Sequence, residues 1–354
     1  MKIALVTDAW HPQVNGVVRT LDSVVKLLRS WGHEVLVISP DQFRSVPAPS
    51  YPEIRLAFTR MKTVGKLIEE FGADAVHLST EGPLCIQARR WCRRKGHPFT
   101  TAYHTQFPEY LAKRTGMSAR IFWPFIRWFH SRSERIMVST ESVRRQLRTQ
   151  GLAHVQHWSR GVDLDNFSAD APPPSIYREI AHPIQLYVGR VAIEKNIEAF
   201  LETDEPGSKV VVGDGPALEA LKARYPEVHF VGRKSGRELA GYYAGADVFV
   251  FPSKTDTFGL VIIEALACGT PVAAYPVTGP IDILTAKSGV MDDRLSLAIR
   301  GALALDSADC IEHGQGYSWD SSARQFLNAL VPLPLCLEYP MVRRMLTKVI
   351  FTRV

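Results

Sequence analysis

The feature that most constrains the fold of this chain is the regular alternation of short apolar runs with amphipathic stretches. Residues 2–7 (KIALVT) are an apolar run, residues 17–28 place Val and Leu on one helical face, and residues 34–39 (EVLVIS) are the next run. Strand, crossover helix and strand form the repeating unit of a parallel sheet. We therefore predict an α/β fold with a doubly wound parallel sheet, which binds ligands at the carboxyl ends of its strands.

The alternation continues through DAVHLS, PFTTAYH and RIMVST, with helices expected from about Pro83, over residues 118–131 and from Glu141, which Thr140 can cap. The stretch RGVDLDNFSADAPPPS, with three consecutive prolines, then interrupts it and is typical of a linker. A second series follows: IQLYVGR, SKVVVGDG, VHFVGR, ADVFVFPS and TPVAAYP.

The chain has 354 residues, enough for about two domains of roughly 150 residues. We expect two Rossmann-like doubly wound domains with a cleft between them. The predicted division is an N-terminal Rossmann-like domain (1–165), a linker (166–182), a C-terminal Rossmann-like domain (183–325) and a C-terminal helical tail (326–354).

The net charge of +6 comes from one segment. Residues 87–160 hold fifteen Lys and Arg against three Glu, a local charge of +12, so the remainder carries −6. Such an excess favours phosphate, nucleic acid or an anionic membrane surface as a partner. A solvated helical face is the alternative. No recognised nucleic-acid reader motif accompanies the basic residues, so we expect no nucleic-acid partner.

The cysteines and the apolar runs bear on the compartment. The five cysteines show no CxxC pair or repeated spacing, which indicates a reducing compartment rather than a disulfide framework or a zinc site. The first apolar run is too short for a signal peptide, and no run approaches the roughly 20 apolar residues that span a bilayer. We expect a cytoplasmic protein that lies peripherally on the inner face of the cytoplasmic membrane.

Two constellations carry the predicted chemistry. In residues 251–272 (FPSKTDTFGLVIIEALACGTPV), Gly259 opens a short apolar helix whose free N–H groups can hold an anion. Glu264 stands among apolar neighbours in that helix, so its carboxylate needs a partner, either a ligand hydroxyl or a group of its own domain. In VGRVAIEKN, Arg190 follows a strand and Lys195 begins the next helix. Two such cations suit a diphosphate, and surface solvation of these side chains is the equal alternative.

These two blocks, together with four others, resemble the retaining glycosyltransferases of family 4, which have the GT-B fold. The stretch from Asp256 to Glu264 is similar to the E-x₇-E signature of that family, and the resemblance covers about residues 1–330. The other matching blocks are DAWHPQVNGVVRT, YHTQFPEY, RWFHSRSERIMVST and SRGVDLDNF.

The resemblance implies that residues 1–165 form the acceptor domain and residues 183–325 the nucleotide-sugar domain. It also implies a role for each matching position. Arg190 and Lys195 would neutralise the departing diphosphate, and Glu264 would bind the ribose hydroxyls. The implied catalytic residues are His104, Arg190, Lys195 and Asp256, with no metal and no cofactor. The implied donor-binding residues are Gly16, Arg190, Lys195, Gly232, Arg233, Asp256, Thr257, Phe258, Gly259, Leu260 and Glu264.

Two positions depart from the family pattern. Asp256 replaces the usual first glutamate and is one methylene shorter. Asn15-Gly16 stands where many members have Gly-Gly, and we expect this change to be mild because Asn tolerates a left-handed backbone. Apart from the resemblance, the pattern favours an interior histidine that is simply hydrogen-bonded at position 104, and the YHTQFPEY block reverses that preference.

The acceptor is predicted from the aromatic and basic stretch RIFWPFIRWFHSRSER, residues 120–135. Aromatic rings and arginines together suit a membrane interface, whereas core packing of the rings with a solvated basic edge is the alternative. The tail EYPMVRRMLTKVIFTRV is predicted to be either a second interfacial helix or a helix that returns across the first domain.

The block pattern is most similar to family members that glycosylate lipids, including sulfoquinovosyl and glycosyl diacylglycerol synthases and mannosyltransferases. We therefore expect transfer of a hexose or uronic sugar from a nucleotide-sugar donor, UDP-linked in the leading hypothesis, to a membrane lipid such as diacylglycerol. One alternative keeps this chemistry with a soluble or polysaccharide acceptor, for example by a GDP-mannose-dependent mannosyltransferase. Another is a non-catalytic nucleotide-sugar-binding protein.

Overall fold

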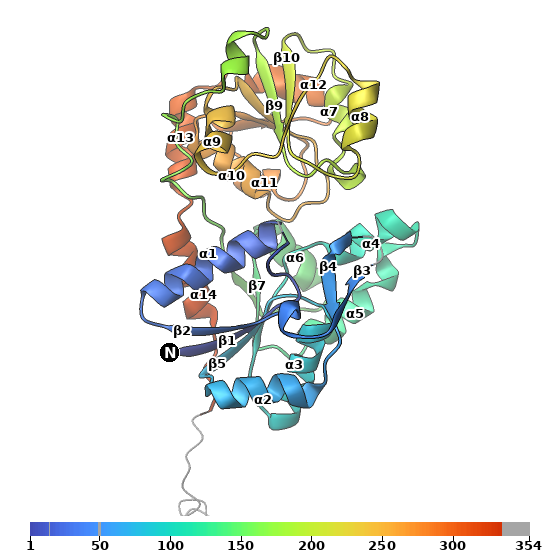
Figure 1. Cartoon of the computed structure of the whole chain (residues 1–354), viewed down its shortest axis with the longest axis vertical. Helices are drawn as coiled ribbons and strands as arrows, with labels where there is room; N and C mark the ends of the chain where they lie inside the picture. Colours follow the sequence, from blue (N-terminus) through green and yellow to red (C-terminus); the bar gives the residue numbers. More distant parts are fainter. Residues whose placement is uncertain (14, 49–50, 335–354) are drawn as a thin grey trace, which may run out of the picture.

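The computed structural model describes residues 1–13, 15–48 and 51–334, and it contains two α/β halves, each built on a six-stranded parallel sheet (Figure 1). The predicted two-sheet GT-B architecture is therefore confirmed. The tail EYPMVRRMLTKVIFTRV lies outside the described residues, so its expected helix stays a prediction.

The first sheet has the strand order β2-β1-β5-β6-β7-β8, all parallel. The order reverses between β1 and β5, so the switch point of this sheet lies at their carboxyl ends. Its strands are β1 (Lys2–Val6), β2 (Glu34–Ile38), β5 (Ala75–Leu78), β6 (Thr100–Ala102), β7 (Arg135–Val138) and β8 (Val155–His157).

Helices cover both faces of the first sheet (Figure 1). Apolar side chains repeat on one face of α1, and the side chains of Leu21, Val24 and Leu28 are fully buried against the strands. The helices of this half are α1 (Gly16–Ser30), α2 (Met61–Phe71), α3 (Pro83–Lys95), α4 (Phe107–Thr115), α5 (Trp123–His130) and α6 (Glu141–Thr149), with 3-10 helices at Pro40–Gln42 and Ala119–Ile121.

The second sheet has the order β11-β10-β9-β12-β13-β14, all parallel, and its switch point lies between β9 and β12. Its strands are β9 (Ile184–Val188), β10 (Ser208–Val212), β11 (His229–Gly232), β12 (Val248–Phe251), β13 (Val272–Ala274) and β14 (Gly289–Met291). Its helices are α7 (Glu198–Leu201), α8 (Leu218–Arg224), α9 (Gly236–Ala244), α10 (Leu260–Ala267), α11 (Pro280–Ile283), α12 (Leu295–Ala302) and α13 (Ser307–Gln315), with 3-10 helices at Ser175–Arg178 and Ile193–Lys195.

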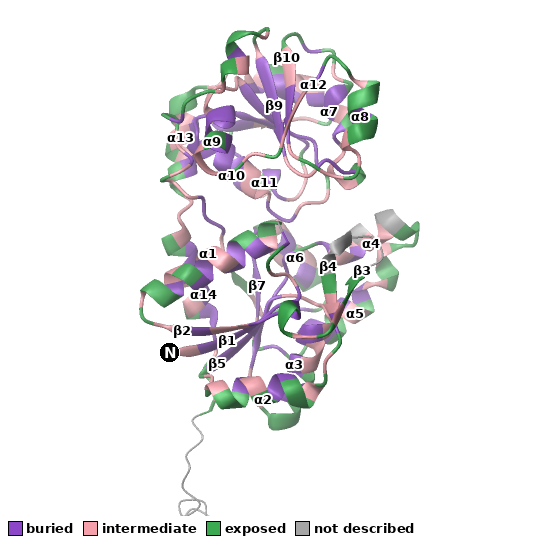
Figure 2. Ribbon diagram, in the orientation of Figure 1, coloured by how far each residue is buried: buried purple, intermediate pink, exposed green. Residues whose placement is uncertain are grey.

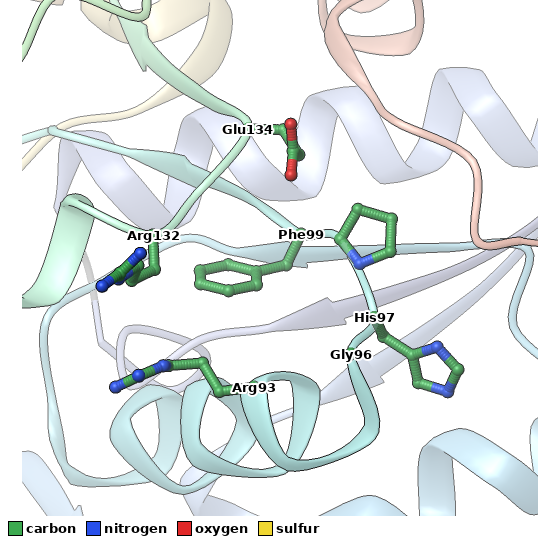
Figure 3. A pocket seen from close by; sticks show the side chains of 7 residues that line it. Arg93, Gly96, His97, Phe99, Arg132 and Glu134 are labelled. Carbon is green, nitrogen blue, oxygen red and sulfur yellow. The ribbon is translucent and has the colours of Figure 1, made fainter.

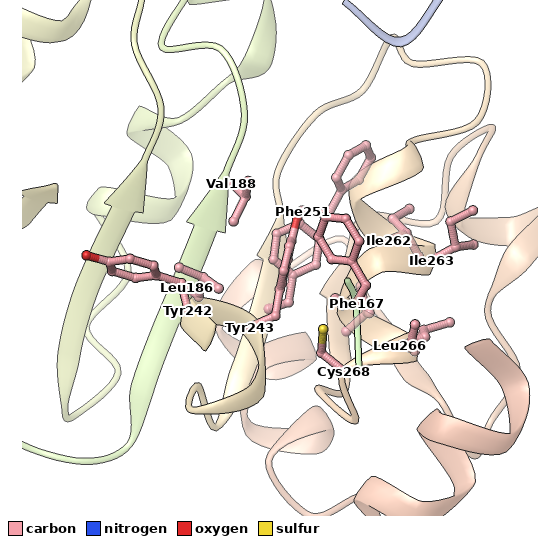
Figure 4. Packing of buried hydrophobic residues seen from close by; sticks show 14 of the residues in the cluster. Phe167, Leu186, Val188, Tyr242, Tyr243, Phe251, Ile262, Ile263, Leu266 and Cys268 are labelled. Atoms are coloured by element: carbon pink, nitrogen blue, oxygen red, sulfur yellow. The ribbon is translucent and has the colours of Figure 1, made fainter. Parts of the chain in front are cut away.

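The interior of the second half places α10 against the sheet. Tyr243, Phe251 and Ile262 pack together in one cluster, and Cys268 lies among the same apolar side chains (Figure 4). Burial raises the pKa of the Cys268 thiol to about 12. This packing makes α10 a rigid support for the residues on its first turns, and Figure 2 shows buried residues concentrated in both sheets.

The last described helix, α14 (Trp319–Ala329), returns to the first half and packs against α1. Ser322 on this helix accepts a hydrogen bond from the Trp158 indole at 3.1 Å, and Phe326 is fully buried in the core of the first sheet. The expected division between residues 325 and 326 thus falls inside one helix.

Several elements were not predicted. The antiparallel pair β3 (Ser45–Ala48) and β4 (Tyr51–Ala57) contains prolines at positions 47 and 52, which argue against strands unless those strands lie at an edge. The strands β8 and β14 are only three residues long and stand at the sheet edges, where their apolar pattern is too short to read.

Candidate active site

The loops at the carboxyl ends of β9 and β12 form the centre of the candidate site. Gly189 and Arg190 follow β9, and residues 252–259 follow β12, so both loops leave the switch point of the second sheet. Loops after β1 and β6 of the first half face them. Ligands of doubly wound sheets bind at such positions, because adjacent loops diverge there.

Lys195 and Asp256 meet at this switch point. The Lys195 Nζ atom donates to Asp256 Oδ1 at 2.6 Å, and both side chains are about one-quarter exposed. Asn196, in a left-handed conformation with φ 55°, donates to the Pro252 carbonyl at 3.1 Å and ties the two loops together. The structure therefore brings the predicted cation and the predicted carboxylate into direct contact with each other.

Arg190 is half-buried, and its carbonyl accepts a hydrogen bond from the buried Tyr187 hydroxyl at 2.9 Å. The neighbouring loop after β10 approaches closely, since a Cβ on Gly213 would lie 1.8 Å from the Gly189 carbonyl oxygen. The Gly213 N–H in turn donates a hydrogen bond to the Gly232 carbonyl, at the end of the next strand, at 3.0 Å. Gly232 and Arg233, two of the predicted donor-binding residues, thus stand on the same sheet edge, two strands from Arg190.

Gly259 precedes α10 in a left-handed conformation with φ 91°, which favours glycine, and a Cβ at this position would lie 3.1 Å from the Phe251 ring. The N–H groups of the first turn of α10 are left without intrahelical partners by helix geometry. Gly16, which begins α1 in the first half, lies beside this turn, because a Cβ added there would be 3.5 Å from Leu260 Cδ1. The predicted donor residues of both halves therefore face one another here.

Asn15, which precedes Gly16, corrects one expectation. Its backbone is extended, with φ −151° and ψ 170°, so left-handed tolerance is not its role. The Asn15 side chain instead accepts hydrogen bonds from the N–H groups of Val17 and Val18, each at 3.0 Å, and caps α1.

Glu264 is buried, with 2% of its surface exposed, and both of its oxygens are occupied. Arg19 of α1 forms an ion pair with Oε1 from across the cleft. The fully buried Tyr243 hydroxyl donates to Oε2 at 3.2 Å from the same half as Glu264. Glu264 also raises the pKa of Arg19 above its usual value. The carboxylate is thus held by its own domain and by the other one.

Hydrogen bonds join the two halves beside the donor loop. The Thr257 hydroxyl donates to the His104 carbonyl at 2.6 Å, and the Thr140 hydroxyl donates to the Thr257 carbonyl at 3.3 Å. Ser142, at the start of α6, donates to Asp282 through both its N–H and its hydroxyl. The loop after β6 and the loop after β12 are therefore in direct contact, and His104 stands at that contact.

His104 is buried, and its Nδ1 atom lies 3.1 Å from an Nη atom of Arg160. Burial first, and then the charge of Arg160, hold the pKa of His104 well below its usual value. Arg160 and Arg19 were assigned no role from sequence, although both stand in blocks that carried the resemblance. Nothing in the local pattern distinguishes these two arginines from solvated ones.

The basic segment divides between core and surface. Trp123 and Phe129 are core residues, whereas Trp128 is 39% exposed and its ring lies 4.2 Å from the Arg89 guanidinium. A pocket of about 340 Å³ lies at the amino edge of the first sheet, and Figure 3 shows Arg93, Arg132 and Phe99 among the side chains that line it. This pocket is at the end of the sheet opposite the candidate site.

Two parallel sheets that face each other across carboxyl-end loops, with cations and a buried carboxylate at the junction, define a two-domain transferase for nucleotide sugars. Two family models match the chain: Glycosyltransferase Family 4 over residues 14–166 and Glycosyl transferases group 1 over residues 182–299. The chain belongs to glycosyltransferase family 4, and it is a glycosyltransferase that uses a nucleotide-sugar donor.

The relatives agree with this assignment. The chain is 32% identical over 308 residues to a GDP-mannose-dependent alpha-mannosyltransferase of Mycobacterium tuberculosis, covering 80% of this chain and 82% of the relative. It is 28% identical to the sulfoquinovosyl transferase SQD2 of Arabidopsis thaliana, covering 77% and 58%. Sucrose-phosphate synthase from Thermosynechococcus elongatus has the same fold, with a TM-score of 0.73, 22% identity and coverage of 98% and 99%.

Proposed function

We propose that this glycosyltransferase acts with retention and without a metal ion, and that it transfers a hexose or uronic sugar to a membrane lipid such as diacylglycerol. The observation that carries the proposal is the junction of the two halves, where Glu264 and Thr257 contact the first half, with Arg190 and Lys195 on the neighbouring loop after β9. The assignment rests on side chains that suit the parts of a nucleotide sugar.

The donor is proposed to lie across the carboxyl ends of β9 and β12. Arg190 and Lys195 would receive the diphosphate, assisted by the first-turn N–H groups of α10. Glu264 would accept hydrogen bonds from ribose hydroxyls, since a carboxylate oxygen has room for a second donor beside Arg19 or Tyr243. The remaining donor contacts are proposed for Gly16, Gly232, Arg233, Asp256, Thr257, Phe258, Gly259 and Leu260.

In the proposed reaction, the bond between the sugar C1 and the diphosphate oxygen breaks, and a bond from C1 to the acceptor oxygen forms on the same face. The acceptor hydroxyl passes its proton to the departing phosphate oxygen, so no separate base is consumed. Negative charge grows on the diphosphate in the transition state. Arg190 and Lys195 would stabilise that charge, which is the largest contribution available to such a site.

The lipid acceptor is supported by apolar and basic surface on the first half. Ile121 is 60% exposed and Trp128 is 39% exposed, and the exposed Arg120 and Arg127 stand near them in sequence. Exposed aromatic and aliphatic side chains beside arginines suit an anionic interface. No helix of the described ranges is both long and apolar enough to cross a bilayer. We propose peripheral binding to the inner face of the cytoplasmic membrane through residues 87–160.

A second feature supports an acyl chain near the site. A pocket of about 400 Å³ is lined by Leu56, Ala57, Phe58 and Pro83, among others, and Phe58 is 67% exposed. Pro83 opens α3 directly after β5, so this pocket stands on the same sheet edge as the candidate site. Its largely apolar lining fits the part of a lipid that adjoins the headgroup.

Two kinds of nucleotide sugar are candidates for the donor. The block pattern favours a UDP-linked sugar, whereas 32% identity to a GDP-mannose-dependent mannosyltransferase favours GDP-mannose.

Purified protein is incubated with radiolabelled UDP-glucose, UDP-glucuronate or GDP-mannose and a lipid extract, with and without EDTA. We expect radiolabelled sugar in the organic phase and the same amount of product with EDTA as without it. We also expect NMR to show an axial anomeric bond in the product, as in the donor. Donor binding without transfer or hydrolysis would instead identify a non-catalytic binding protein.

Vesicle co-sedimentation tests the membrane proposal separately. We expect binding to anionic vesicles at low salt, release at high salt, and loss in the double variant Arg120→Glu, Arg127→Glu. The matched control is Arg224→Glu, Arg294→Glu, which changes the same net charge on the second half, where both side chains are exposed. Equal vesicle binding by the two double variants, or no vesicle binding by the wild type, would contradict the membrane proposal.

A further inference from the structure

Arg160 is a buried cation that forms no ion pair within the described part of the chain. It is 4% exposed, and its guanidinium donates to the carbonyls of Trp158 and Ser159, at 2.8 and 3.3 Å. It also lies 4.5 Å from the Trp158 ring. Buried charges without a counter-ion are costly and rare, so this arginine needs an explanation beyond packing.

The third partner of Arg160 is His104 Nδ1, at 3.1 Å. A guanidinium has only donors, so in this contact Nδ1 must accept and cannot carry a proton. A neutral imidazole then carries its single proton on Nε2. The arginine therefore selects one tautomer of His104 by hydrogen bonding alone.

The surroundings also keep the ring neutral. His104 is buried, and the titratable groups acting on it are Arg160 and the buried His77, both of which disfavour a positive charge on the ring. Desolvation lowers the pKa of Arg160 itself to about 9, which still leaves it charged at neutral pH. A neutral histidine beside a cation is the only arrangement compatible with this contact.

The Nε2 atom, across the ring from Arg160, is buried and has no hydrogen-bond partner among the residues that the structure describes. The same residue accepts the Thr257 hydroxyl through its carbonyl, so it stands at the contact between the halves and beside the donor loop. An unpaired buried N–H at that place lacks an acceptor that a bound ligand can supply.

We infer that Arg160 is a positioning residue that fixes His104 as a neutral Nε2–H hydrogen-bond donor toward an oxygen of the bound substrate. This inference rests on the proposed function of the cleft. It assigns His104 the role of a donor and not of a general base, because Nδ1 is occupied and Nε2 already holds the proton. Arg160 acts through the histidine and does not itself contact the substrate.

The first test is independent of activity. Long-range ¹H–¹⁵N NMR of the ¹⁵N-histidine-labelled full chain, with His104 assigned by the loss of its signals in His104→Gln, reports the tautomer directly. We expect an unprotonated Nδ1 and a protonated Nε2 that do not titrate between pH 6 and 8. An imidazolium, or a proton on Nδ1, in the wild type would overturn the inference.

Variants then test whether Arg160 sets that state. Arg160→Leu is expected to produce a mixture of tautomers, and Arg160→Lys, which keeps a charged donor, to restore the wild-type pattern in part. The matched control is Arg89→Leu, because Arg89 is also buried and donates to main-chain carbonyls but does not contact His104. A wild-type His104 pattern in a folded Arg160→Leu protein would count against the inference.

A double-mutant cycle tests the route of the effect on turnover. We expect Arg160→Leu to lower kcat on the order of tenfold in the wild-type background, and less than about twofold in the His104→Gln background, where a side-chain amide donates without a tautomer. Equal losses in both backgrounds would show that Arg160 does not act through His104. If no donor is turned over, the proposed function fails, while the NMR measurement still decides the state of His104.

Discussion

At the scale of single residues, charged side chains of the candidate site have hydrogen-bond partners within the protein itself. Lys195 donates to Asp256, Arg19 is paired with Glu264, and Arg160 is bonded to His104. Such pairs fix the side chains in place at the start, so less conformational entropy is lost on binding. Each pair also leaves hydrogen-bonding capacity on one partner, which is where we expect substrate to be recognised.

Lys195→Ala is the residue-level test of the donor site. We expect turnover to fall by about 10²- to 10³-fold, because one fixed charge opposite the leaving group is lost, while the folded structure survives at a partly exposed position. The measurement is kcat with the active donor, together with the circular dichroism spectrum. Lys222→Ala, an exposed lysine on α8, is the control. Near-normal kcat would remove Lys195 from the site.

Two buried histidines predict the pH dependence of stability. Desolvation lowers the pKa of His77 to about 3 and holds the pKa of His104 well below its usual value. Below about pH 6.5 the unfolded chain therefore binds more protons than the folded chain, so the free energy of unfolding falls as pH falls. The expected slope is up to about 1.4 kcal/mol per pH unit for each histidine.

Urea unfolding at pH 7, 6 and 5 measures that slope. The variant His77→Phe keeps an aromatic ring against Phe326 and Trp158, whose centroids lie 4.9 and 6.2 Å away, and removes one titrating group. We expect it to flatten the pH dependence by the share of one histidine. The same slope in the variant and in the wild type would contradict the assignment.

At the scale of elements, helix starts decide how the loops of the site are presented. Asn15 caps α1 and thereby places Gly16 against Leu260, while Thr140 caps α6 and also donates to the Thr257 carbonyl. In both cases the residue that satisfies a helix end also lies at the junction of the halves. Capping and positioning of the site are therefore performed by the same side chains.

Asn15→Ala tests the capping role of Asn15. We expect the free energy of unfolding to fall by about 1 kcal/mol, since two helix N–H groups lose their acceptor. Ser235→Ala is the matched control, because Ser235 occupies the same position before α9 but its side chain makes no capping hydrogen bond. Equal losses of stability in the two variants, measured by urea unfolding, would show that the cap contributes nothing.

At the scale of the whole molecule, hydrogen bonds of Thr257, Thr140 and Ser142 and the ion pair of Arg19 with Glu264 join the two halves. Interfaces of this limited kind permit relative motion of domains. The α14 helix is a second link, because it carries the chain back onto the first half. The ion pair between Arg19 and Glu264 is therefore expected to hold the two halves together.

Arg19→Ala tests this expectation in solution. Without the ion pair, we expect the radius of gyration of the donor-free protein, measured by small-angle X-ray scattering, to rise above that of the wild type. Arg29→Ala on the same helix is the control, because Arg29 donates to the Val35 carbonyl of its own half. An unchanged radius in Arg19→Ala would show that the pair does not hold the halves together.

The sequence by itself determined most of the elements and the α/β class of the fold. Apolar runs such as IQLYV and VFVF mark buried parallel strands, and Gly259 and Thr140 mark helix starts, because these signals depend on a residue and its near neighbours. The site residues that follow strands were predictable for the same reason: a parallel sheet brings all carboxyl ends to one edge.

Only the tertiary structure decided what these residues contact. The partners of Glu264 stand 245 and 21 positions away in the chain, and Arg160 meets His104 across 56 positions. The buried state of Arg160, the core position of Trp123 and the exposed position of Trp128 likewise depend on which elements pack together. Burial and pairing are properties of the assembled molecule, because distant segments supply the atoms that exclude water and complete each hydrogen bond.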